Sequence, residues 1–182
     1  MTRGPTLPAH RSHRLPTPLD AFNAAPADEA GALLVHCLHS LRWAHRITEH
    51  RPYPDADSLL AAADEATYDL SPTDLAEALA SESLPDLPED TYSAATTALT
   101  AAHAAYEAKF GHVFVIYLGD TPPEERLDRV LEGVYSRLEN DPEDERVMSV
   151  EQLRRLAQGR LMEKLRGAAN CATSPNAPAP GK

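Results

Sequence analysis

Apolar side chains recur every three or four residues through most of the chain, the spacing that places them on one face of an α-helix. The first such stripe follows Pro26, and the pattern continues through Trp43 and Ile47 until Pro52 and Pro54, which stop any helix. The sequence therefore predicts a continuous buried stripe, which begins with Ala30, Leu33, Leu34, Cys37, Leu38 and Leu41.

Three further helices are predicted between Asp57 and Gly111. Asp57 is expected to cap a short helix, and Ser71-Pro72-Thr73-Asp74 predicts an N-cap, a first-turn proline and an acidic first turn for the next one. Leu75 and Leu79 should point inward. A longer, alanine-rich helix is expected from Glu89 to Phe110, ending at Gly111.

The remaining pattern predicts a buried turn and two more helices. The run from His112 to Leu118 is apolar and β-branched but has no second strand to pair with, so we expect an extended turn or the first turn of a helix. Thr121-Pro122-Pro123-Glu124 has capping-box spacing. The inner stripe of the helix that follows is Leu127, Val130, Leu131, Val134, Tyr135 and Leu138, and a final helix is expected from Arg146 to Leu165.

Together these elements predict an all-α bundle of about six to eight helices in one domain, residues 17–168. Residues 1–16 and 169–182 are rich in proline, alanine and small polar residues, and they are expected to be disordered tails.

Composition narrows the classes of partner. A formal charge of −11 disfavours nucleic acid and anionic membranes, and no long apolar run predicts a membrane span. The two cysteines form no ligand spacing or disulfide framework, so a cytoplasmic location is expected.

A search for known motifs of cofactor and metal chemistry is negative. The chain has no glycine-rich phosphate loop, no H-E-x-x-H and no Gly-x-Ser-x-Gly elbow. His36 and His39 lie three residues apart on a predicted helix, but two imidazoles without a third ligand make a poor metal site, and a surface role is favoured. We therefore expect neither a metal nor a cofactor.

Several segments, in order, resemble the OHCU decarboxylases, the helical enzymes that convert 2-oxo-4-hydroxy-4-carboxy-5-ureidoimidazoline (OHCU) to (S)-allantoin in urate breakdown. They are F-N-A-A-P-A-D-E-A at 22–30, C-L-H-S-L-R-W-A at 37–44, R-P-Y-P-D-A-D-S-L-L-A-A-A-D-E-A at 51–66, L-A-E-A-L-A at 75–80 and the block from Tyr106 to Glu143. The resemblance runs from Leu19 to about Leu165 and implies the family's helical fold, no cofactor and a homodimer.

The segment that carries the family's catalytic motif is altered. The family has His-Pro-Arg-Ile-Gly after the fourth of these segments, and an alignment without a gap puts Glu82 at the histidine and Ser83 at the proline. The family's following Glu-Gln pair is also absent, with Glu89 as the nearest carboxylate. His103 stands where the family tends to have asparagine, and Arg160 is the closest match to an arginine expected to bind the substrate carboxylate, although the count along the helix favours Leu161.

The resemblance implies a reaction that needs a proton donor, donors to the substrate ring and a cation for the carboxylate. Glu82 can supply the proton only when burial favours its protonated form, and an ionised Glu82 would repel the substrate. His103 or His112 could instead supply an imidazole, although for His112 the role of a satisfied turn residue is favoured. The backbone N–H groups from Gly111 to Phe114 are candidate ring donors, and Arg160 is either the carboxylate clamp or an ordinary surface arginine.

Three functions follow. The first is OHCU decarboxylation. The second is a diverged relative that binds a small anionic or ureide-like ligand without decarboxylation, or acts as a helical interaction module. The third is another small-molecule reaction that uses Glu82 as acid or base.

Overall fold

Eight helices in the described residues connect without a strand, which confirms the all-α prediction. The computed structural model describes residues 16–85 and 93–171, with side chains described up to 167 and, after the gap, from 96. The helices are α1 (Pro18–Ala24), α2 (Ala27–Cys37), α3 (Leu41–Glu49), α4 (Ala56–Tyr68), α5 (Pro72–Ala80), α6 (Ser93–Phe110), α7 (Pro123–Arg137) and α8 (Pro142–Cys171).

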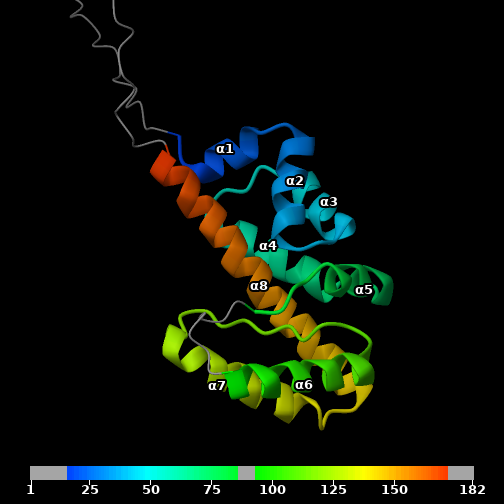
Figure 1. The fold of residues 1–182 in the computed structure, drawn as a ribbon. Coiled ribbons are helices and arrows are strands. Elements are labelled where there is room, and N and C mark those ends of the chain that lie inside the picture. The colour runs from blue at the N-terminus through cyan, green and yellow to red at the C-terminus, as the bar shows by residue number, and fades with distance from the viewer. Residues whose placement is uncertain (1–15, 86–92, 172–182) are drawn as a thin grey trace, which may run out of the picture.

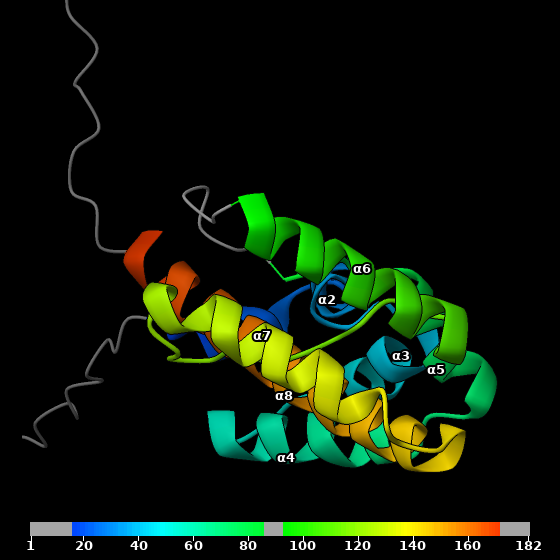
Figure 2. The same ribbon diagram turned by 60° about the horizontal axis from the view of Figure 1, so that its bottom comes forward.

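The long helix α8 joins two parts of the molecule (Figure 1). Its first turns lie beside α6 and α7, and its later turns contact α4, α2 and α1. Helices α6 and α7 pack against each other; in Figure 2, α6 and α4 appear at opposite sides, and α7 is drawn over α8 between them. In the described ranges, no helix is long and apolar enough to cross a membrane.

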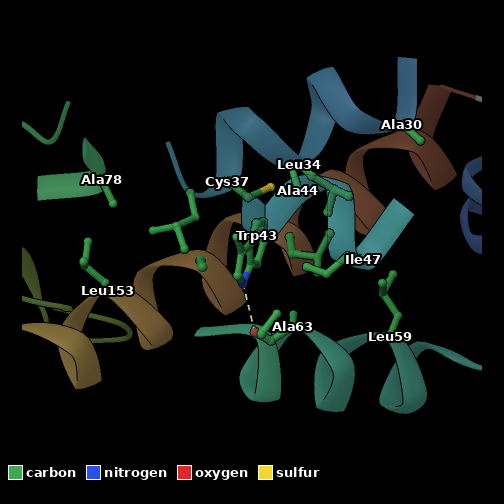
Figure 3. Close-up of a cluster of buried hydrophobic side chains, with 14 of the residues drawn as sticks. Ala30, Leu34, Cys37, Trp43, Ala44, Ile47, Leu59, Ala63, Ala78 and Leu153 are labelled. Carbon is green, nitrogen blue, oxygen red and sulfur yellow. Dashed lines mark hydrogen bonds between the residues drawn. The ribbon is translucent and has the colours of Figure 1, made fainter. Parts of the chain in front are cut away.

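The larger hydrophobic core is built by α2, α3, α4, α5 and α8 around Trp43 (Figure 3). The Trp43 indole is 1% exposed, and its N–H donates to the Ala63 carbonyl and to the Thr67 hydroxyl, both at 3.0 Å. Because a buried indole N–H costs free energy when it has no acceptor, these two bonds fix the orientation of α3 on α4.

The smaller core lies between α6, α7 and the extended segment 112–118. Phe114 and Tyr106 are fully buried there against Val130 and Val134. Phe114 and Val115 are buried without strand pairing, which confirms the predicted extended turn. Gly111 ends α6 with φ +77°, a backbone conformation that glycine adopts at little cost.

The stripe after Pro26 is not one helix, and this is the main error of the sequence prediction. Helix α2 ends at Cys37, Leu38 is extended, and the buried Ser40 hydroxyl accepts the Trp43 N–H to begin α3. A capping hydrogen bond thus interrupts an apolar period that would otherwise continue. As a result Leu41 is 67% exposed, contrary to the prediction.

Side-chain caps set the starts of two other helices and are absent at a third. Ser71 forms the predicted N-cap and capping box of α5, and Leu75 and Leu79 are buried. Asp55, not Asp57, caps α4, because its carboxylate accepts the Ser58 N–H at 2.7 Å. The capping box predicted at Thr121 does not form, since α7 begins after Pro122 without a side-chain cap.

The last two helices also differ from the prediction in detail. Tyr135 is 54% exposed, whereas the predicted stripe placed it inside. Helix α8 begins at Pro142 and extends to Cys171, so it is longer than predicted and reaches past residue 168. The predicted tails otherwise fall almost entirely outside the described residues.

Candidate functional site

Glu82 lies just after α5, where the chain leaves the helix. Its backbone N–H donates to the Leu79 carbonyl at 3.3 Å, which continues the last turn of α5 by one residue. The side chain is only 3% exposed, although it ends in a carboxylate. A buried charge of this kind requires partners, and these come from two other elements.

Arg160 on α8 is the first partner. Its two terminal nitrogens donate to the two Glu82 oxygens at 2.7 and 2.8 Å, and Nη1 also donates to the Cys37 carbonyl at 3.0 Å. The hydrogen bonds from the guanidinium to Glu82 raise the pKa of Arg160. Leu161 is fully buried in the core, so Arg160 is the residue of this turn that faces the site. Of these two residues, only Arg160 lines the pocket in front of Glu82.

The bend between α2 and α3 is the third side of this site. It contributes the Cys37 carbonyl to Arg160 and the imidazole of His39 to the surroundings of Glu82. The His39 Nδ1 atom lies 4.0 Å from the nearer Glu82 oxygen, too far for a hydrogen bond, and this buried atom has no partner among the described residues.

This position of His39 differs from the predicted one, in which His36 and His39 lie on one helix. His36 is on α2, where its Nδ1 lies 2.7 Å from the Ala32 carbonyl at the surface, whereas His39 lies beyond the helix end. Ser40, an N-cap residue type, was the signal in the sequence that separates the two histidines.

A pocket of about 640 Å³ opens in front of the Glu82–Arg160 pair. Residues 82–85, residues 115–120 and one face of α8 form its walls. Gly159 lets the Tyr117 ring approach α8, because a Cβ at this position would lie 3.0 Å from the ring. The Tyr117 backbone N–H donates to Gln152 Oε1 at 2.8 Å, which ties this wall to α8. The volume suits a ligand the size of a substituted small heterocycle.

His103 lies in a different position from the one its predicted role requires. It lines a separate pocket of about 330 Å³, which shares only Leu84 and Pro85 with the larger pocket. Burial lowers the pKa of His103, and its ring stacks on Phe114 with 5.9 Å between centroids. The structure therefore puts His103 and Glu82 in different pockets.

The turn that begins at Gly111 also lies apart from Glu82. The Gly111 N–H donates to the Glu107 carbonyl at 2.8 Å and closes α6, so it is already used. His112 lines a third pocket, with its Nδ1 2.9 Å from the Val113 carbonyl, and Phe114 is fully buried. The pocket that contains Glu82 is lined by the next residues of this segment, from Val115 on. Glu89 lies outside the described residues.

A buried polar network, which the sequence argument did not identify, supports that segment. Arg137 donates to the Glu145 carboxylate and, through Nη1, to the Val115 carbonyl at 2.6 Å. Tyr106, Asn140 and Ser149 donate to the same carboxylate. The sequence did carry a signal, since Arg137 follows Val130 and Val134 on the inner face of α7.

The fold and several of its segments correspond to known proteins. A sequence profile described as OHCU decarboxylase matches residues 23–97 and 83–162. The chain belongs to the OHCU decarboxylase family. The sequence matches no curated protein. The described ranges contain no group of three or more His, Cys, Asp or Glu side chains arranged to hold a metal ion.

Two solved structures have the same fold. A crystal structure of (S)-allantoin synthase superposes with a TM-score of 0.65 and 21% identity over 80% of this chain and 53% of that one. This chain thus spans about half the length of that protein. A crystal structure of OHCU decarboxylase in the presence of (S)-allantoin has a TM-score of 0.64 and 18% identity, and the match covers 78% of this chain and 99% of that one.

Proposed function

We propose that this member of the family is a cofactor-free decarboxylase of urate breakdown that acts on OHCU in the pocket in front of Glu82. One observation carries the proposal. Where the family has its histidine, a buried acid is bonded to Arg160, a cation of the right geometry to bind a carboxylate. An acid and a carboxylate clamp are two of the groups that the reaction requires.

The two groups neutralise each other before a ligand arrives. Arg160 donates to both Glu82 oxygens, so in this arrangement neither oxygen carries a proton to give. A substrate carboxylate can take over this bidentate contact, since it has the same geometry as the Glu82 carboxylate. Glu82 then lies buried beside a second anion without its cation, and this favours uptake of one proton.

Proton uptake converts Glu82 into the required acid. The bond between the ring and its carboxylate breaks, carbon dioxide leaves, and the electron pair remains on the ring. The Glu82 proton is then transferred to the ring, and the Glu82 carboxylate returns to Arg160. The cycle involves no oxidation and consumes one proton per carbon dioxide released.

The test is to supply OHCU freshly made from urate by urate oxidase and hydroxyisourate hydrolase, and to follow its decay and the circular dichroism of allantoin. We expect OHCU to decay faster than it does spontaneously and to give a single enantiomer of allantoin. Glu82→Gln should lower kcat by about 100-fold or more, the usual contribution of a positioned acid. Arg160→Met should also lower the rate, because it removes the carboxylate clamp. Its matched control is Arg155→Met, since Arg155 is an exposed arginine on the same helix. Decay at the spontaneous rate with the wild-type protein would refute the proposal.

Binding without decarboxylation is the second candidate, and the closed ion pair favours it. Arg160 already has three hydrogen bonds to protein acceptors, so a ligand must compete for it. If the pocket serves only to bind a carboxylated ureide, Arg160→Ala should weaken the binding of allantoate much more than that of neutral allantoin, measured by calorimetry. Equal losses for both ligands would exclude Arg160 as the clamp.

We further infer a cytoplasmic location and a homodimer, the latter by analogy with the family. The free, buried Cys37 is consistent with a reducing compartment. Light scattering after gel filtration tests the dimer, and a mass of one chain would exclude it.

A further inference from the structure

We propose that His39 delivers protons from solvent to Glu82, and this inference rests on the proposed decarboxylation. Each cycle consumes one proton, which must reach a carboxyl group whose side chain is 3% exposed. In the proposed cycle Glu82 takes up this proton after the substrate has filled the pocket in front of it, so the proton has to arrive from another side.

His39 joins the two environments that such a relay has to connect. The imidazole is 40% exposed as a whole, yet its Nδ1 atom is buried, has no hydrogen-bond partner among the described residues, and lies 4.0 Å from Glu82 Oε1. One ring thus has a face in water and a buried nitrogen beside the acid. An unsatisfied buried nitrogen costs free energy, so its position requires a reason.

The resting distance is explained by Arg160. While Arg160 holds both oxygens, Glu82 needs no bond from His39. When a substrate carboxylate takes Arg160, the freed Glu82 oxygen can close the gap to Nδ1. Catalytic hydrogen bonds are often long in the absence of substrate and shorten in the complex.

The transfer balances without another reactant. A protonated imidazole gives the proton on Nδ1 to the Glu82 carboxylate, and the neutral ring takes a proton from water at Nε2 after the ring has exchanged its tautomer. The charged groups around this route are Glu82 and Arg160. At longer range, Glu163 acts on Arg160, and Lys164 acts on the Cys37 thiol. His39 is absent from the pocket lining, so it acts through Glu82 and not on the substrate.

The experiment compares His39→Gln with His36→Gln in the full chain, using the OHCU assay. His36 is the matched control, because it is an exposed histidine three residues away whose Nδ1 contacts its own helix. We expect His39→Gln to lower kcat by about 100-fold with KM unchanged, the lower end of the usual contribution of a proton-transfer group. His36→Gln should match the wild-type protein. In His39→Gly, added imidazole should restore activity, whereas pyrrole, which has the same shape but no basic nitrogen, should not.

The possible failures are distinguishable. Activity in the wild-type protein with equal kcat values for the two glutamine variants would overturn the relay but leave the decarboxylase. Equal rescue by imidazole and pyrrole would mean that the His39 ring only fills space, and this would also overturn the relay. No activity in the wild-type protein would overturn both.

Discussion

Replacing Glu145 by glutamine should destabilise the fold more than any exposed charge change on α8. Glu145 is 1% exposed and accepts hydrogen bonds from Arg137, Tyr106, Asn140 and Ser149. Burial alone would raise its pKa, but the hydrogen bonds from Arg137 and Tyr106 outweigh burial and lower the pKa below its usual value. The substitution leaves Arg137, whose side chain is 8% exposed, without a counter-charge.

Removing one partner of a buried ion pair costs about 3 to 5 kcal/mol. We expect about 3 kcal/mol for glutamine, because its amide oxygen can still accept one bond from Arg137. With a urea m-value of about 2 kcal/mol per M, the midpoint should fall by about 1.5 M. Because the native stability of a domain is only about 5 to 15 kcal/mol, such a loss is large.

The assay is urea unfolding followed by circular dichroism and by the fluorescence of Trp43, the single tryptophan. Glu143→Gln is the matched control. Glu143 lies two residues before Glu145 and forms an exposed pair with Arg146, so its replacement should leave the midpoint unchanged. The lowered pKa means that the Glu145 contribution is present above about pH 4.5 and is lost as the pH falls through the folded-state pKa. The variant should lack this part of the acid sensitivity. A cost below about 1 kcal/mol would refute the argument that this carboxylate is the required counter-charge.

Three other substitutions or treatments test the cores. Gly111→Ala should lower the free energy of unfolding by about 1 kcal/mol, measured by thermal unfolding, since φ +77° strains any other residue. Gly167 lies inside α8 with open space around it, so Gly167→Ala should stabilise the fold slightly or have no effect. Trp43→Phe should cost about 1 to 2 kcal/mol in urea unfolding because it removes both indole hydrogen bonds, and a neutral result would contradict their role. Burial raises the pKa of Cys37 to about 11, so its thiol should not react with a disulfide reagent at pH 8 until the chain unfolds; rapid reaction in the native protein would contradict its burial.

Periodicity predicted the helical class and most of the buried positions, but it could not predict where capping bonds interrupt the helices. After α2 ends at Cys37, the Ser40 hydroxyl begins α3 as a separate helix, because it accepts the Trp43 N–H, a donor that the first turn of a helix leaves unpaired. The Asp55 cap of α4 is a similar case. Such choices depend on backbone angles of single residues, which the apolar period does not encode.

The candidate site was predictable only as far as the resemblance extended. It supplied Glu82 and Arg160, and the structure shows that they meet although 78 residues separate them. His103 and Gly111 were named by position along the chain, but the packing of α6 directs them to other pockets. His39 was discounted because a straight helix would have kept it beside His36, and only the bend at Leu38 brings it to Glu82.

The bonds that support the two cores do not involve the residue at position 82. Arg137, which is bonded to Glu145, donates to the Val115 carbonyl, and Trp43 holds α3 on α4. Neither set of bonds includes the residue at position 82. Position 82 can therefore change while both cores persist, provided that the new side chain satisfies Arg160. A carboxylate satisfies it more strongly than an imidazole, since it accepts two parallel bonds from the guanidinium. Glu82 thus gives Arg160 a stable partner, and a carboxylated ligand that binds Arg160 has to displace this partner first.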